Sequence, residues 1–303
     1  MAILYKNGMW NFPGTVCVLL AAASLPEKAE RAYEKGRYHE AVSAYAELAE
    51  KAAPESRGEY LKRLAESYYK DQEHEKAFTA YLSALDAVQP QKTAYQPSAE
   101  DERLYQEALK IYLDPAERDP ELTALKIKDL YAGILRLHPD YFELGFLVAA
   151  SYANLNEIEK FFEIFFRSYK ELPDHYMAYK TKAILHLKLF DRGRTVEEKE
   201  KQRDLVLASL QEAKKRYPKD TTIYRLQIAF AHPAQKEEIL KRNLKEILDQ
   251  SIVIPRSDLS FYFDQLFAFR EKELASALLV KARIWYPYSR TLDAAKEMIE
   301  EEK

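Results

Sequence analysis

The chain has 303 residues, of which 47% are apolar and 31% charged, and its net charge at pH 7 is −3. This slight acidic excess provides no basic footprint for nucleic acid. The 7 glycines are scattered and form no GxGxxG or GxxxxGKS/T loop for nucleotide phosphates. The single cysteine excludes an intramolecular disulfide and a cysteine-based zinc site. We therefore expect no cofactor, metal or nucleic-acid ligand.

Residues 1–23 differ from the rest of the chain. Lys6 is their only charged residue, and 15–25 reads TVCVLLAAASL without a charge. A short apolar stretch before small residues such as Ala21 to Ala23 is typical of a secretory signal. The stretch is too short to cross a bilayer, which needs about 20 residues. The sequence predicts a cleaved signal peptide here, and the alternative is an N-terminal apolar helix packed under the first helical repeat.

A repeat begins after this segment. Ala41 and Tyr45 recur 36 residues later as Ala77 and Tyr81, in two stretches with the same order of residue types. Each stretch is followed by a proline, at positions 54 and 90, which would end a helix because proline lacks an amide hydrogen. Recurrence at this period is typical of a solenoid built from short helical units.

This pattern resembles the tetratricopeptide repeat, a helix-turn-helix unit with small residues where its two helices cross, large aromatic residues beside them and a final proline. Pro139, Pro173, Pro218 and Pro287 continue the series, and Ala149, Phe165 and Ser168 occupy matching positions between the first two of these prolines. The resemblance covers roughly residues 24–287. It implies an all-α, right-handed α-solenoid of about seven repeats, of bacterial type.

In chain order, we expect repeats 1 and 2 in 24–90, a loop or hinge in 91–98, repeats 3 to 7 in 99–287, and a C-terminal capping helix in 288–303. Between Pro173 and Pro218 the spacing exceeds the usual repeat, and we assign the extra residues to a solvated loop near 191–203. The capping helix is expected because its apolar residues, Leu292, Ala295 and Ile299, recur at helical spacing among charged ones.

One segment is unusually aromatic. Residues 161–166 read FFEIFF, and they fall in the second helix of the fourth repeat. We interpret most of this run as core between neighbouring repeats, and we expect Phe162 and Phe166 to be its most exposed members.

The resemblance also implies that the first helix of each repeat lines a concave groove. Carried over to this chain, the groove has a polar first end and an apolar, aromatic middle. The partner-binding residues predicted in this way are Tyr33, Tyr69, Tyr105, Leu109, Tyr112, Phe146, Met177, Ile184, Leu187, Arg225 and Phe267. An open apolar groove indicates a partner, of which the expected part is an amphipathic helix or an extended apolar peptide.

No catalytic motif accompanies the repeats, since the histidines have no zinc-like spacing and the carboxylates are spread among Lys and Arg on helix faces. The sequence thus predicts a non-catalytic protein-interaction scaffold without a membrane span, exported to the bacterial periplasm for envelope assembly. Two alternatives remain open: a cytoplasmic chaperone or regulator whose apolar N-terminus is part of the fold, and an enzyme whose site has no recognisable motif.

Overall fold

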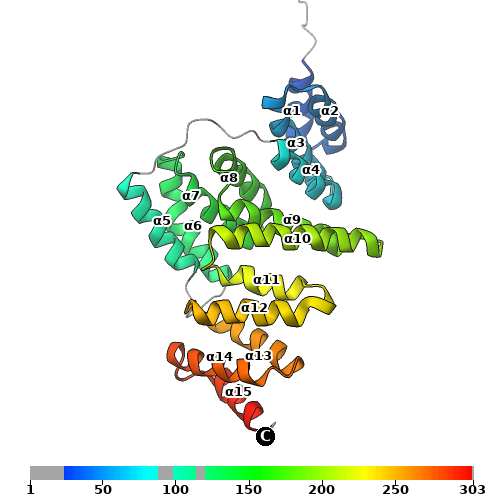
Figure 1. Ribbon diagram of the computed structural model, residues 1–303. Helices are drawn as coiled ribbons and strands as arrows, with labels where there is room; N and C mark the ends of the chain where they lie inside the picture. The colour runs from blue at the N-terminus through cyan, green and yellow to red at the C-terminus, as the bar shows by residue number, and fades with distance from the viewer. Residues whose placement is uncertain (1–23, 88–97, 114–119, 302–303) are drawn as a thin grey trace, which may run out of the picture.

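A computed structural model describes residues 24–87, 98–113 and 120–301 (Figure 1). Every regular element in these three stretches is a helix. The α-helices in chain order are α1 (Leu25–Glu34), α2 (Tyr38–Lys51), α3 (Pro54–Lys70), α4 (His74–Ala87), α5 (Ala99–Tyr112), α6 (Pro120–Leu137), α7 (Phe142–Asn154), α8 (Ile158–Glu171), α9 (Tyr176–Arg192), α10 (Val196–Arg216), α11 (Thr221–Phe230), α12 (Lys236–Asp249), α13 (Leu259–Ala268), α14 (Lys272–Trp285) and α15 (Arg290–Glu301). Two 3-10 turns, η1 (Pro233–Gln235) and η2 (Arg256–Asp258), precede α12 and α13.

Consecutive helices pack in adjacent pairs, which confirms the all-α, repeat-like class that the sequence predicts. The predicted signal segment 1–23 lies outside the described residues, as does almost all of the predicted 91–98 loop. Helix boundaries follow the prolines. α2 ends three residues before Pro54, and α6, α8, α10 and α14 each end two residues before the prolines at 139, 173, 218 and 287.

The turn inside a helix pair has one construction in four places. The first helix is followed by a residue of positive φ, and in α3–α4 this residue is Gln72, at 63°. Its amide donates to the carbonyl of Tyr69 at 3.2 Å, and the next amide, of Glu73, donates to the carbonyl of Tyr68 at 2.9 Å. This Schellman arrangement satisfies the last carbonyls of the first helix. The same pair of bonds recurs at Gly36, Asn156 and Arg270, and it also occurs at Ser251, which follows α12 and precedes η2.

The alanines of the repeat pattern lie in the core. Ala41, Ala77, Ala149 and Ala275 are each 0% exposed, and the paired aromatic Tyr45 is 2% exposed. Short side chains let the two helices of a pair approach closely, and the large ring beside them fills the remaining space. The small residues that the repeat pattern places between paired helices are therefore core residues.

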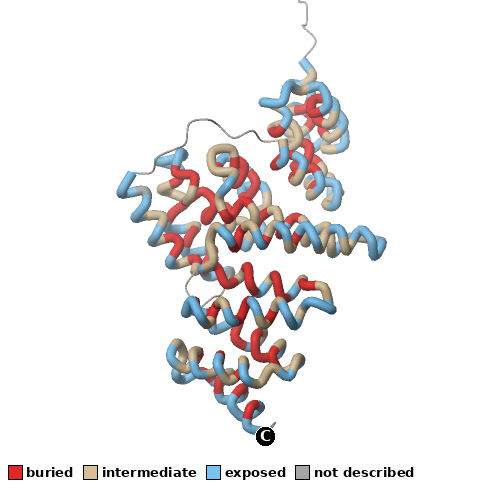
Figure 2. The backbone as a smooth tube through the Cα atoms, viewed as in Figure 1, coloured by how far each residue is buried: buried red, intermediate tan, exposed pale blue. Residues whose placement is uncertain are grey.

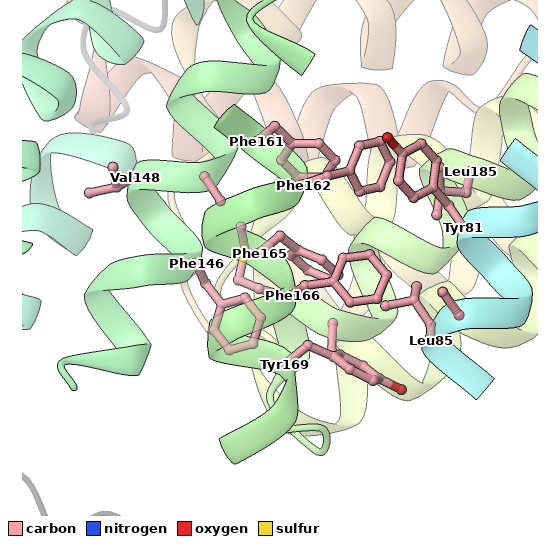
Figure 3. Packing of buried hydrophobic residues seen from close by; sticks show 14 of the residues in the cluster. Tyr81, Leu85, Phe146, Val148, Phe161, Phe162, Phe165, Phe166, Tyr169 and Leu185 are labelled. Carbon is pink, nitrogen blue, oxygen red and sulfur yellow. The ribbon is translucent and has the colours of Figure 1, made fainter. Parts of the chain in front are cut away.

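The N-terminal helices do not simply precede α5 in a row. α4 packs against α9, while α5 contacts α6 and α7 (Figure 1). The aromatic run of α8 explains this arrangement, because Phe162 and Phe166 are each 1% exposed and face Tyr81 of α4 (Figure 3). Our expectation that these two rings are the most exposed of the run is wrong. They are covered by a helix pair that is distant in sequence.

Ion pairs surround this contact between α3–α4 and α8–α9. Lys70 pairs with Glu159, and Lys170 of α8 pairs with Glu59 of α3. Farther along, Lys182 of α9 lies 3.0 Å from Asp86. A buried aromatic centre with charged pairs at its edge is the usual composition of a specific interface.

The extra residues of the fifth pair lengthen both of its helices. α9 and α10 have 17 and 21 residues, and their hairpin extends beyond the neighbouring pairs (Figure 1). The predicted solvated loop at 191–203 is wrong for most of its length. Thr195 starts α10 with a capping box, because its hydroxyl accepts from the amide of Glu198 at 3.1 Å and that carboxylate accepts from the amide of Thr195.

Buried residues run along the middle of the array (Figure 2) and form two clusters, one from α1 to the start of α11 and one from α11 to α15. The expected C-terminal helix is present as α15, where Leu292, Ala295 and Ile299 are 0%, 3% and 8% exposed. Its apolar stripe covers the end of the second cluster, and its other residues are mostly exposed.

Candidate functional site

A recess, which we call the inner recess, lies among helices of the N-terminal and middle parts of the chain. Its volume is about 680 Å³, within the range of ligand pockets in proteins. Residues of α3, α4, α5, α6, α7, α8, α9, α11 and η2 line it. The recess therefore depends on the docking of α3–α4 beside α8–α9, because Tyr69, His74 and Phe78 of the N-terminal helices form one of its sides.

Most of the recess wall is apolar. Phe78 of α4, Ile158 and Phe161 of α8, and Ile184 of α9 face it from different helices. Ile184 is 40% exposed, which is unusual for an isoleucine in the middle of a long helix that is packed on both ends. An apolar surface held open by well-packed helices can bury side chains of a ligand at little conformational cost.

A buried ion pair borders the recess. Lys180 of α9 is 4% exposed, and its Nζ lies 2.6 Å from Oδ2 of Asp220 and 2.7 Å from the hydroxyl of Tyr112. Asp220 also caps α11, since its other oxygen accepts from the amide of Thr222 at 3.1 Å. This network links α5, α9 and α11, and within it Asp220 neutralises the charge of Lys180.

Three more cations line the recess. Arg225 of α11 donates to Oδ1 of Asp258 at 2.8 Å and is neutralised there. Lys188 and Arg192, both in α9, have no carboxylate within ion-pair distance among the described residues. The guanidinium of Arg192 instead lies 5.5 Å from the ring centroid of Phe78, across the contact between α9 and α4. One end of the recess thus combines apolar walls with two unpaired positive charges.

The predicted groove residues divide into three groups. Five of them line this recess, namely Tyr69, Tyr112, Met177, Ile184 and Arg225. Tyr105 and Leu109 line a second, smaller recess of about 480 Å³. The remaining four, which border neither recess, are Tyr33, Phe146, Leu187 and Phe267.

The last group has local packing roles. Phe146 is 1% exposed and stacks on His175 with 4.6 Å between ring centroids, so this side chain belongs to the core. Tyr33 packs against Tyr38 and under the guanidinium of Arg63. The last two, Leu187 and Phe267, are partly buried against the first and second core clusters.

Sequence reasoning missed the contribution of α4 and the end of α9. Phe78 lies in the second helix of its pair, and second helices are not expected to line the inner face. Arg192 belongs to the stretch that we assigned to a solvated loop. No spacing in the sequence indicates that α4 docks on α9.

The second recess surrounds His175, the residue before α9. Its Nδ1 accepts from the amide of Met177 at 3.3 Å, so the neutral ring carries its proton on Nε2, which lies 3.5 Å from the hydroxyl of Tyr105. Burial lowers the pKa of His175 to about 4. Burial also raises the pKa of Tyr105 and of Tyr176, and these groups are therefore uncharged at neutral pH.

The described residues contain no group of three or more His, Cys, Asp or Glu side chains placed to hold a metal ion. None of their helices is both long enough and apolar enough to cross a membrane.

The sequence matches no protein-family model and no curated protein. The resemblance to tetratricopeptide repeats thus stays a prediction that rests on the residues themselves.

Proposed function

We propose that the chain is a non-catalytic scaffold of tetratricopeptide type, a right-handed solenoid of about seven repeats that binds an apolar or amphipathic segment of a partner protein in its inner recess. The observation that carries this proposal is the recess of about 680 Å³, whose apolar wall includes the half-exposed Ile184. The equivalent turns at Gly36, Gln72, Asn156 and Arg270 support the repeat assignment.

Peptide selection tests the binding proposal. A library of 16-residue peptides displayed on phage, each with three fixed leucines at helical spacing, is selected on the purified protein. Clones are then compared on two variants, Ile184→Gln inside the recess and Val280→Gln on the exposed face of α14, where Val280 is 65% exposed. We expect enriched clones to lose binding on the first variant and to keep it on the second. Clones that bind both variants equally would contradict the proposal.

For the location, we propose export to the periplasm and a role in assembling the bacterial envelope, on the basis of the uncharged stretch 15–25. The test is the intact mass and the cell fraction of the full-length chain after expression in a bacterium. A periplasmic product that lacks about the first 23 residues is expected. An uncut product in the cytoplasmic fraction would favour a cytoplasmic chaperone or regulator.

A further inference from the structure

The charges around the inner recess do not balance. Four cations line it, Lys180, Lys188, Arg192 and Arg225, and the one carboxylate among the lining residues is Asp258. Asp220 and Asp258 neutralise the first and the last of the four. Lys188 and Arg192 remain unpaired among the described residues, although ion pairs are frequent elsewhere on these helices.

The two unpaired cations belong to one face of α9. Ile184, Lys188 and Arg192 follow each other at intervals of four residues, which places them in line along the helix. Two like charges at this spacing repel and destabilise a helix slightly. The negative end of the helix dipole favours a cation near Arg192 at the C-terminus, but it acts mainly within the last turn. Stability of α9 therefore does not explain why both charges face the recess.

The apolar wall continues directly beside these charges. Arg192 lies over the ring of Phe78, and Ile184 precedes Lys188 by one turn, so a bound segment that covers Ile184 also reaches the cations. Where a ligand excludes water, a carboxylate beside a cation interacts more strongly than it does at an open surface. A ligand complementary to this surface thus carries acidic side chains beside its apolar stripe.

We infer that the bound segment carries side-chain carboxylates that border its apolar stripe and pair with Lys188 and Arg192. This inference rests on the proposed function, since it concerns the chemistry of the same recess. The occupant is an acidic amphipathic peptide segment of a partner protein, and its apolar side chains contact Ile184 and Phe78 while its Asp or Glu side chains lie toward the end of α9.

The phage library described above provides the probe, with the positions beside its fixed leucines randomised. Selection is run in parallel on the wild-type protein, on Lys188→Gln/Arg192→Gln and on Lys110→Gln/Lys126→Gln. The last variant removes two exposed lysines that do not line the recess, and it changes the net charge by the same amount. Circular dichroism of each variant verifies that it is folded.

We expect Asp and Glu to be enriched beside the leucines on the wild-type protein and on the lysine control, and not on Lys188→Gln/Arg192→Gln. The strongest wild-type clone is then made as a labelled peptide with an amidated C-terminus, so that only side chains supply carboxylates. Replacing its acidic residues by Gln should weaken binding to the wild-type protein about tenfold, as two screened ion pairs would, and less at high salt.

The outcomes separate the two proposals. Clones that depend on Ile184 but show no acidic enrichment would overturn this inference and leave the proposed function standing. Acidic enrichment that persists on Lys188→Gln/Arg192→Gln would also overturn it. A selection that yields no clone dependent on Ile184 would overturn the proposed function, and the inference with it.

Discussion

The ring of Tyr81 in α4 stacks on the ring of Phe162 in α8, with 3.2 Å between the centroids and 9° between the planes. The two helices belong to pairs that are separated by α5 and α6 in the chain. This contact fixes the N-terminal helices beside α8–α9, and it thereby places Phe78 on the wall of the inner recess. The proposed binding surface thus depends on a packing contact outside the repeat pattern.

The first prediction concerns this contact. Tyr81→Ala should lower the free energy of unfolding by about 3 to 5 kcal/mol, because it leaves a large cavity against Phe162. Tyr81→Phe keeps the stacked ring and removes a buried hydroxyl that has no hydrogen-bond partner among the described residues, so it should be neutral or stabilising. Urea denaturation measures both. A loss of less than about 1 kcal/mol in Tyr81→Ala would show that the two helix pairs are not held together by this ring.

Such a contact could not have been read from the sequence. The period of 36 residues, the alanines at the crossings and the prolines after the helices are local signals, and they predict the helix pairs well. The docking of α4 on α9 joins segments that are distant in the sequence. Several apolar surfaces have a similar composition, so composition does not identify which of them α4 contacts. The run FFEIFF signals burial but not the burying partner, and for this reason our exposure prediction for Phe162 and Phe166 is wrong.

The candidate site was predicted only in part, because the repeat pattern does not indicate contacts between segments that are distant in sequence. Five predicted residues line the inner recess because they lie on first helices that keep the repeat register, and Ile184 is one of them. Phe146 also keeps this register, but His175 and Phe165 cover it. The repeat register specifies the face of the helix on which a residue lies. The exposure of that residue also depends on neighbouring segments that the register does not identify.

A second prediction concerns acid stability. Burial lowers the pKa of His175 from 6.5 to about 4. Between these pH values the imidazole is therefore protonated in the unfolded chain and neutral in the folded protein. Stability from this residue is complete above pH 6.5 and is lost as the pH falls from 6.5 to 4, by about 2 to 3 kcal/mol in total. A proton on Nδ1 would also remove the acceptor for the amide of Met177. The nearby charged groups, Asp174 and Arg216, pair with each other at 2.7 Å.

Urea denaturation from pH 4 to 7.5 tests this prediction, with His175→Asn as the control. Asparagine can still accept from the amide of Met177 as an N-cap, but it does not titrate. The variant should be less stable at pH 7.5, because it loses the stack on Phe146, and its stability should depend less on pH between 4 and 6.5. Parallel curves for the two proteins would show that His175 is protonated freely in the folded state.

The positive-φ turns give a third prediction. Arg270 adopts φ = 57° at the end of α13, a conformation that costs less for glycine than for a residue with a Cβ atom. Arg270→Gly should therefore raise the free energy of unfolding by about 0.5 to 1 kcal/mol. Gly36→Ala should lower the free energy of unfolding by about 1 kcal/mol through backbone strain. A steric clash does not contribute, because no atom lies within 4 Å of the added methyl position. Thermal denaturation should shift in opposite directions for the two variants, and a shift of both in one direction would rule out equivalent turns.

A fourth prediction concerns the crossing of α7 and α8. A methyl group on Gly145 would collide with Oγ of Ser168, which is buried and has no hydrogen-bond partner among the described residues. Gly145→Ala alone should cost about 1 to 3 kcal/mol of stability. In the double variant with Ser168→Ala the methyl meets the Cβ of residue 168 at 3.5 Å and Cγ2 of Ile164 at 3.8 Å, both ordinary contacts. The double variant should match or exceed Ser168→Ala alone, because alanine favours the helix by about 1 kcal/mol over glycine. Additive losses in the double-mutant cycle would refute the close crossing.

Cross-link mapping tests most directly whether the inner recess binds the partner segment. The strongest selected peptide is synthesised with a photoreactive phenylalanine in its apolar stripe, cross-linked to the wild-type protein and located by mass spectrometry. Two apolar surfaces compete with the recess, one on α6 with Leu130 and Leu137, and one on α14 with Val280 and Ile284. Binding in the recess should give cross-links to α8 and to the segment Met177–Arg192 of α9. Cross-links concentrated on α6 or α14 would contradict it.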